Sequence, residues 1–293
     1  MSRIQIRPAH GVEVKLCRML LGHEGSTHPN YHLFVALDDS QLPLAAGSVR
    51  SGVEELNELW GVHFQSLPGA HGDHLDAALL AYARAYAASQ GANVLQTLRW
   101  FEQGSAEEAY WASLGFAPEQ LRYAHEIDIP HARERLTPLL DQVREHGWIP
   151  PDARIISLAH ANIEDVCDLH LKYLGGSIRH LLPLLDGTAP HPYDRDASVV
   201  LLCGEQTRGF TLGWFPDPTI CEISANVLHP SVRLGGADLL LKYAAMERVR
   251  ARNVNRFRFC TAEKHSDSRR TLAWVGGGIT RTEVRLQTTC RTN

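Results

Sequence analysis

The sequence lacks any pair of cysteines in Cys-x-x-Cys spacing, and it lacks an apolar run that approaches membrane-spanning length. Its six cysteines are scattered along the chain: Cys17, Cys167, Cys203, Cys221, Cys260 and Cys290. This pattern indicates neither a zinc site nor a disulfide framework, and it is typical of reduced residues in an intracellular protein. We therefore expect no metal ion in the protein.

A signal peptide and a strong charge excess are also absent. The N-terminal stretch Met-Ser-Arg-Ile-Gln-Ile-Arg has no apolar region, and the formal net charge is -4. The charge excludes a global basic surface for nucleic acid, and the local arginine cluster at 248–258 is interpreted as a solvated helix face and strand. We expect a cytoplasmic protein that binds neither nucleic acid nor a membrane. Its oligomeric state stays open.

The chain contains two similar halves. Its 293 residues, 44% of them hydrophobic, are enough to bury two cores of ordinary size. Similar segments recur in order at an offset of roughly 160 residues, which is far longer than a solenoid repeat. They are Ile6–His10 with Ile156–His160, Gly47 with Gly209, and Trp111–Phe116 with Trp274–Ile279. The pattern predicts a doubled domain.

A linker separates the halves. Residues 131–146 have helical periodicity, and Gly147-Trp-Ile-Pro-Pro151 ends that helix because paired prolines prevent its continuation. We therefore predict an N-terminal domain at 1–130, a helical linker at 131–152 and a C-terminal domain at 153–293.

Hydrophobic periodicity predicts one order of elements in both halves: strand, helix, three strands, helix, strand, helix, strand. The first half has expected strands at 4–7, 32–37, 44–49, 58–64, 94–98 and 123–129, and helices at 12–21, along Leu75, Leu79, Tyr82 and Tyr86, and at 105–113. The second half has expected strands at 155–156, 198–203, 209–215, 220–227, 255–260 and 282–287, and helices at 163–174, 238–252 and 267–274. Residues 175–196 are expected to form a long, substrate-facing connection.

Both halves also contain a strand, a glycine turn and a helix in succession, at 62–80 and 227–241. The first N–H groups of a helix have no intrahelical acceptor, and together with the helix dipole they can hold a phosphate. The repeated motif predicts a duplicated anion-binding unit.

These residues resemble the GNAT superfamily of N-acetyltransferases in its tandem-domain form. Its hallmark is a strand ending in Val, then Gln/Arg-x-x-Gly-x-Gly/Ala leading into a helix with Leu-Leu, and later a Leu-Gly-Phe element. In the second half, Val227 and Leu240-Leu241 place Gly235 and Ala237 at the small-residue positions. Arg233 lies one place after the usual Gln/Arg position.

The first half matches this hallmark less well. It has Ser113-Leu-Gly-Phe116, but its turn allows two alignments. Either His74 and Asp76 or Ala70 and Gly72 take the small-residue positions.

The resemblance implies an α/β (α+β) protein with two tandem GNAT-like domains, each a mixed, mostly antiparallel sheet flanked by helices. It also implies that the second turn binds the pyrophosphate of acetyl-CoA, with no metal. The implied binding residues are Val227, Arg233, Leu234, Gly235, Gly236 and Ala237. The alternative is a glycine turn that only permits close packing. In the first half Asp73 and Asp76 would repel a phosphate, which favours a structural first domain.

Acetyl transfer to an amine needs a group that takes the amine proton. The resembling family often supplies this base from the strand before the turn, so Glu222 is the candidate and Glu58 its counterpart; the alternative for both is a solvated carboxylate. The family's tyrosine acid falls at Trp111 or Trp274, and an indole cannot perform that step. Transfer without a dedicated acid stays open, as does an acid from His265, Asp267 or Ser268.

Together these features predict an acyl-CoA-dependent N-acetyltransferase that acts, through its second domain, on an amine of a small molecule or peptide. The alternative is a non-catalytic ligand-binding or scaffolding module that retains the fold. Gly235 and Ala237 favour the enzyme, whereas the two tryptophans and the poor first turn favour the scaffold.

Overall fold

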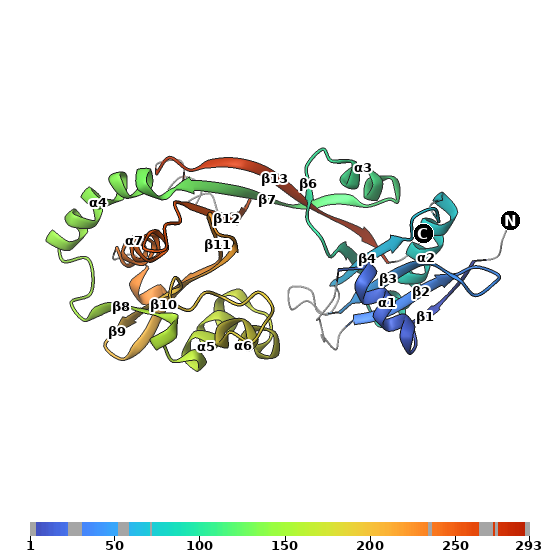
Figure 1. Ribbon diagram of the computed structural model, residues 1–293, viewed down its shortest axis with the longest axis horizontal. Coiled ribbons are helices and arrows are strands. Elements are labelled where there is room, and N and C mark those ends of the chain that lie inside the picture. Colours follow the sequence, from blue (N-terminus) through green and yellow to red (C-terminus); the bar gives the residue numbers. More distant parts are fainter. Residues whose placement is uncertain are drawn as a thin grey trace. The chain divides into compact units, whose positions relative to one another are not determined.

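The computed structural model describes residues 4–22, 31–51, 59–70, 72–233, 236–263, 272 and 275–290. The chain divides into two compact units (Figure 1). Unit 1 contains Met1–Leu121 and Glu283–Asn293, and unit 2 contains Arg122–Thr282. This division differs from the expected boundaries because two long strands each contribute one segment to either unit.

Unit 1 is a mixed sheet flanked by helices. The sheet order is β1-β2-β3-β4-β5-β13, followed by β7. Strands β1 to β4 pair antiparallel in chain order, and β5 pairs parallel with β4 and antiparallel with β13. The elements are β1 Gln5–Pro8, α1 Val12–Leu20, β2 Tyr31–Leu37, β3 Pro43–Arg50, β4 Leu59–Ser66, α2 Asp73–Ser89, β5 Val94–Thr97, β6 Phe101–Glu102, α3 Ala106–Ser113, and parts of β7 Ala117–Asp128 and β13 Gly278–Thr289.

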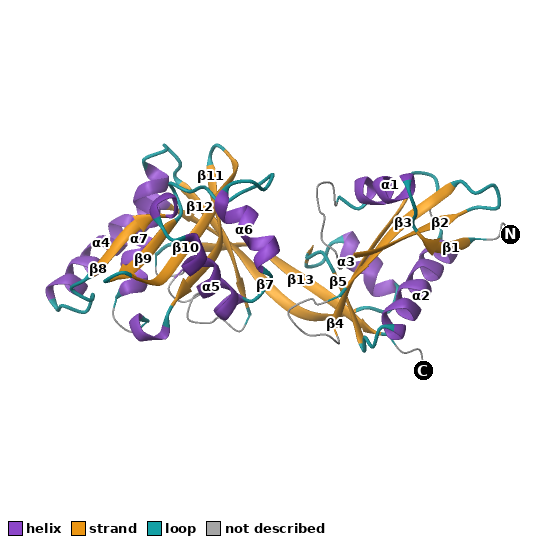
Figure 2. Cartoon of the chain, turned by 90° about the horizontal axis from the view of Figure 1, so that it is seen from below, coloured by secondary structure: helices purple, strands orange, loops and turns teal. Residues whose placement is uncertain are grey.

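The helices α1 and α2 lie on opposite faces of this sheet (Figure 2). The stripe predicted for α2 is confirmed: Leu75 and Leu79 are buried, and Tyr82 and Tyr86 pack against the same core. On the opposite face, Cys17 and Leu21 pack over the centre of the sheet in a smaller cluster. Amphipathic periodicity was therefore sufficient to place both helices.

Unit 2 repeats the arrangement with the sheet order β7-β12-β11-β10-β9-β8. Here β11 and β12 are the parallel pair, and the pairs β8–β9, β9–β10, β10–β11 and β12–β7 are antiparallel. The elements are α4 Ile129–Glu145, β8 Ala153–Ser157, α5 Ile163–Leu174, α6 Ile178–Asp186, β9 Val199–Cys203, β10 Gln206–Asp217, β11 Ile220–Leu228, α7 Ala237–Arg250 and β12 Arg256–Ala262, with short 3-10 helices at Leu158–His160 and Pro230–Val232.

Helices α5 and α6 cover one face of this sheet, and α4 and α7 cover the other (Figure 1). The segment 175–196, expected to be a long, substrate-facing connection, contains α6. Its Leu181 and Leu185 lie on one side of the helix and are buried beside α5. No helix was predicted in this segment, and Pro183 lies within α6. None of the described helices is long and apolar enough to cross a membrane.

The expected linker helix, α4, is an integral part of unit 2. It runs antiparallel to α7, because Arg133 near its start donates to Tyr243 (3.3 Å) and Val143 near its end contacts Gly236. Its buried side chains repeat at helical spacing: Ile129, Ala132, Leu136, Leu140 and Val143. The segment that joins the two halves in sequence is therefore also a packing layer of the second.

A substitution at Gly236 would test the packing of α4 against the start of α7. Its backbone is left-handed (φ +68°), and a Cβ there would lie 2.1 Å from Val143 Cγ1. We predict that Gly236→Ala destabilises the protein by about 2–4 kcal/mol, from backbone strain and overpacking together. In a Val143→Ala background the cost should fall to about 1 kcal/mol, because the collision with Cγ1 is removed and the backbone strain is the main cost that remains. Urea unfolding of the four proteins measures both costs, and equal costs in the two backgrounds would contradict the contact.

Candidate functional site

The parallel strands of unit 2 separate at their carboxyl ends. They pair from Ile220 with Arg256 to Ile223 with Phe259. Beyond that point β11 stays paired with β10 as far as Leu228, and β12 stays paired with β7 as far as Ala262. The result is a fork between β11 and β12 whose inner edges carry backbone N–H and C=O groups.

A β-bulge lies at the start of the fork. Ile223 pairs with Gly213 and Ala225 pairs with Leu212, so Ser224 has no partner on β10. It also lies beyond the last pair with β12, and its side chain is exposed. A bulge leaves its extra residue outside the ladder. Ser224 is therefore out of register with both neighbouring strands, at the point where the fork begins.

The bulge also reverses the two faces of β11. Cys221 and Ile223 pack on the side of α7, whereas Ala225 and Val227 pack on the side of α5 and α6. Glu222, which precedes the bulge, consequently lies on the α5/α6 face and is half-buried. Among the predicted binding residues, Val227 is 4% exposed, so its side chain belongs to the core.

The turn between β11 and α7 contains the other predicted binding residues. Arg233 is exposed, Ala237 is the first residue of α7 and is fully buried, and Leu234 and Gly235 lie outside the described residues. The N–H groups of the first turn of α7 lack intrahelical acceptors by helix geometry. A Cβ at Gly236 would collide with Val143, which explains a glycine here by packing alone; a binding role of its N–H stays a prediction.

The first turn of α7 also carries an acidic residue, Asp238. It forms an ion pair with Lys242 (2.5 Å), and Asn226 on β11 donates to it at 3.4 Å. An isolated carboxylate here would repel a phosphate, but the neighbouring ammonium offsets its charge. Because the charges of Asp238 and Lys242 offset each other, the exposed Arg233 gives the turn a net positive charge.

The corresponding fork in unit 1 differs. Strands β4 and β5 pair as far as Val62 with Thr97 and then separate. However, β3 and β4 pair without any shift in register, so β4 has no bulge. Gly61, one position before the end of the pairing, stands where Glu222 stands in unit 2. Glu58, the predicted counterpart of Glu222, lies outside the described residues.

The first turn of α2 holds a carboxylate that is used within unit 1. Ser66 at the end of β4 donates to Asp76 at 3.4 Å, and the hydroxyl of Tyr110 on α3 also bonds to Asp76. Asp73 is the first residue of α2, as Ala237 is of α7, so the two residues are equivalent by helix position. The two sequence alignments gave Gly72 or Asp76 as the equivalent of Ala237, and Asp73 lies between them. We interpret the Asp76 cluster as a structural clamp between α2, α3 and β4.

The position expected for a tyrosine acid belongs to the core of unit 1. Trp111 is 4% exposed and packs against Phe64 (ring centroids 4.7 Å apart), Phe116 (4.9 Å) and Phe101 (6.2 Å). It therefore has a packing role. Trp274 and the alternative acids His265, Asp267 and Ser268 lie outside the described residues.

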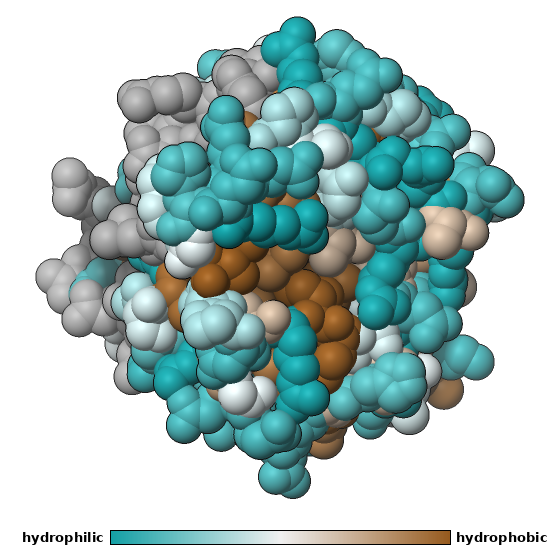
Figure 3. Space-filling view, turned by 90° about the vertical axis from the view of Figure 1, so that its left-hand side faces the viewer, coloured by the Kyte–Doolittle hydropathy of each residue, from teal (hydrophilic) through white to brown (hydrophobic). Residues whose placement is uncertain are grey.

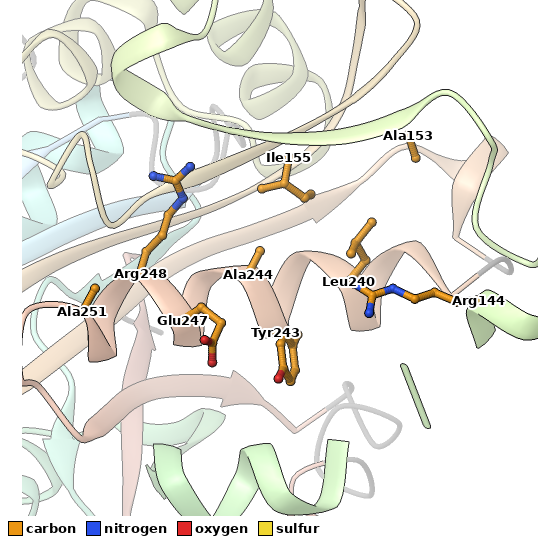
Figure 4. Close-up of a pocket in the computed structure, with 9 residues that line it drawn as sticks. All are labelled: Arg144, Ala153, Ile155, Leu240, Tyr243, Ala244, Glu247, Arg248 and Ala251. Carbon is orange, nitrogen blue, oxygen red and sulfur yellow. The ribbon is translucent and has the colours of Figure 1, made fainter. Parts of the chain in front are cut away.

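A groove of about 540 Å³ lies elsewhere in unit 2, between α7 and the edge strand β8 (Figure 4). Ile155, Leu240 and Ala244 line it, with Arg144, Glu247 and Arg248 at its margins. Figure 3, which views this end of the molecule, shows apolar side chains gathered in a hollow among polar ones. None of the described site residues lines the groove, and the described residues include no cluster that could hold a metal ion.

Comparison with solved structures identifies the fold. A tandem GNAT protein from the clavulanic acid biosynthesis pathway has 16% sequence identity and a TM-score of 0.64, over 99% of this chain and 100% of that one. A GCN5-related N-acetyltransferase from Sphaerobacter thermophilus has 12% identity and a TM-score of 0.59, over 99% and 96%. A probable N-acyltransferase from Enterococcus faecalis has 12% identity and a TM-score of 0.67, over 99% and 73%.

The chain therefore has the GNAT fold in its tandem form, which confirms the resemblance and the fold class that the sequence predicted. At these identities the likeness establishes the fold alone. No protein-family model matches the sequence, and no curated protein matches it.

The clamp in unit 1 has a pH-dependent consequence. Burial raises the pKa of Tyr110, and the charge and hydrogen bonding of Asp76 raise it further. Because the native state then holds the phenolic proton more tightly, the clamp stabilises below the unfolded pKa of about 10 and weakens as the pH rises above it. We predict that Tyr110→Phe costs about 1 kcal/mol at neutral pH, and that this cost shrinks above about pH 10.

Thermal unfolding of wild type and Tyr110→Phe between neutral and alkaline pH measures this difference. Tyr86→Phe, which changes a tyrosine on α2 that stacks on His32, is the matched control. A difference between wild type and Tyr110→Phe that is the same at every pH would contradict the hydrogen bond to Asp76.

Proposed function

We propose that this protein is an acyl-CoA-dependent N-acetyltransferase and that unit 2 carries out the transfer. The main support is the coincidence of three features at one place: the fork, the bulge that leaves Ser224 out of register with β10, and the Glu222 carboxylate one position before the last pair of β11 with β12. Unit 1 has a fork, but its β4 has no bulge and has Gly61 at the equivalent position.

Acetyl-CoA would supply the acetyl group as a thioester. The first-turn N–H groups of α7, starting at Ala237, and the guanidinium of Arg233 are the groups that would hold its diphosphate. Leu234, Gly235 and Gly236 precede Ala237 in the sequence and would contribute backbone N–H groups only. The fork would admit the extended arm, because β11 and β12 no longer pair in register beyond Ile223 and Phe259.

The chemistry would then rest on two groups of β11. The N–H of Ser224 would donate to the carbonyl oxygen of the acetyl group, on which negative charge develops during attack. Glu222 would accept the proton that the amine loses as the new C–N bond forms. The C–S bond breaks and CoA leaves as a thiolate, which would take its proton from solvent, because the second half has Trp274 at the tyrosine-acid position and an indole is not an acid.

A non-catalytic ligand-binding protein with the same fold is the second candidate. Two observations favour it: Gly236 is explained by packing, and a buried Trp111 replaces a tyrosine acid. Neither observation involves Ser224 or Glu222, and both of these lie at the fork. We therefore favour the enzyme.

We predict that one acetyl-CoA binds per chain, in unit 2. Arg233→Met should weaken binding about ten-fold or more, because it removes a charge-assisted contact. Gly235→Asp should weaken it at least as much, because it adds a repelling charge. Calorimetric titration of the full chain gives affinity and stoichiometry, and Asp76→Asn in unit 1 is the matched control. A stoichiometry of two, or an unchanged affinity of both unit 2 variants, would move the site elsewhere.

We also predict that Glu222→Gln lowers turnover about 100-fold or more without changing the affinity for acetyl-CoA. The defect should shrink as the pH rises toward the pKa of the free amine, since the amine then arrives neutral. Glu205→Gln is the control, because Glu205 is a 91% exposed surface carboxylate paired with Arg154. Rates measured against pH test both parts, and a variant as fast as wild type near neutral pH would return Glu222 to a surface role.

A further inference from the structure

Four side chains lie in one row across the sheet of unit 2, next to the fork. Trp214, Glu222, Arg258 and Glu126 are direct neighbours in register on β10, β11, β12 and β7. Their chain neighbours Phe215, Ile223, Phe259 and Ile127 all pack on the side of α7. Because successive side chains of a strand alternate, the row lies on the opposite face. This part of that face lies beyond the core that α5 and α6 cover.

The charged side chains of the row differ in the ion pairs that they form. Glu126 accepts from Arg256 at 3.1 Å through one oxygen and contacts Arg258 at 3.7 Å through the other. Arg256 also donates to Thr219 at 3.2 Å. Among the described residues, Arg258 has only this longer ion-pair contact, and the Asp217 carboxylate lies close enough to interact with its charge. A guanidinium carries five N–H donors, and the Arg258 side chain is 37% exposed, so it has donors left for a ligand.

Glu222 is the carboxylate next to Arg258 in the row. It forms no ion pair or hydrogen bond with any other side chain in the part of the chain that the structure describes, and it lies directly between Trp214 and Arg258. Neighbouring strands are about 4.8 Å apart, so the two charged side chains start close together. One position before the fork, the surface therefore presents an adjacent carboxylate and guanidinium.

An aromatic surface adjoins the carboxylate on its other side. Trp214 lies next to Glu222, and His191 from the connection between α6 and β9 packs against it, with ring centroids 5.7 Å apart. The order along the row is thus aromatic, acidic, basic. A ligand of matching chemistry has an amine, a carboxylate close to it, and a carbon skeleton that can rest on Trp214.

We propose that the acceptor is a free amino acid, whose amine binds at Glu222 and whose carboxylate binds Arg258. This inference rests on the acetyltransferase function proposed above. Arg258 is then the specificity-determining residue, and Glu126 positions its guanidinium. A diamine would place a second cation against Arg258, and the amine terminus of a peptide lacks the nearby carboxylate, so the row disfavours both.

The experiment compares amino acids with the amines that remain after loss of their carboxylate: phenylalanine with phenethylamine, tryptophan with tryptamine, and lysine with cadaverine. Release of CoA thiol and the mass of the product are measured with the full chain and acetyl-CoA. We expect kcat/KM to be at least about ten-fold higher for each amino acid than for its partner, because a charge-assisted pair is gained.

Arg258→Met should raise KM for the amino acids by about ten-fold to one hundred-fold and leave kcat/KM for the matched amines within about two-fold. Arg256→Met is the matched control. It lies two positions away on the same face of β12 but is already paired with Glu126, so we expect less than about a three-fold change. A merely structural role of Arg258 would affect amines and amino acids alike.

The outcomes separate the two proposals. Equal rates for the paired acceptors, or a loss in Arg258→Met that is the same for both, would overturn the inference and leave the acetyltransferase standing. If no acetyl transfer occurs, calorimetric titration with the same amino acids decides: binding that is lost in Arg258→Met supports the amino-acid site and removes only the transferase. Absence of both transfer and binding overturns the two proposals together.

Discussion

The arrangement of unit 2 depends on two parallel strands that separate while each remains held on its outer side. Strand β11 keeps its pairing with β10 to Leu228, and β12 keeps its pairing with β7 to Ala262. Among the described residues, the inner edges beyond Ile223 and Phe259 therefore have no strand partner in register, and a backbone group costs about 1–3 kcal/mol if it is buried unsatisfied. The bulge at Ser224 adds a further residue without a register partner at the start of the fork.

Both units contain a pair of parallel strands that separate, but the residues at the separation differ. In unit 1 the strands also separate, but β4 stays in register, so Trp60, Val62 and Phe64 all face α2 and Phe64 packs on Trp111. In unit 2 the bulge turns the later residues of β11 to the other face and leaves Ser224 at the fork. The carboxylate of the first helical turn is likewise used differently: by Tyr110 in unit 1 and by Lys242 in unit 2. Shared topology therefore does not carry shared chemistry.

Local periodicity predicted most of the elements, including α5 at the residues expected, because amphipathic spacing is set by packing against one face. The bulge could not be predicted. Cys221, Ile223, Ala225 and Val227 alternate as a regular half-buried strand would, yet the structure divides them between two cores. For this reason no sequence signal pointed to Ser224, and none pointed to Arg258 because the side chain next to it belongs to another strand and depends on register. Glu222 was predicted from its position before the turn, and its role stays a prediction.

Strands β7 and β13 each contribute a segment to both units, and no local sequence pattern predicted this. The shared strands decide which segments of the chain are needed to build the candidate site. Boundaries at 130 and 153 follow the pause in periodicity, but pairing assigns Arg122–Asp128 to the sheet of unit 2, where Glu126 stands opposite Arg258. The same exchange gives unit 1 the segment of β13 that pairs with β5. A fragment starting at residue 153 would lack β7, α4 with Val143, and Glu126. The candidate site is therefore built from both halves of the sequence although it lies in one unit, and duplication alone does not make either half independent.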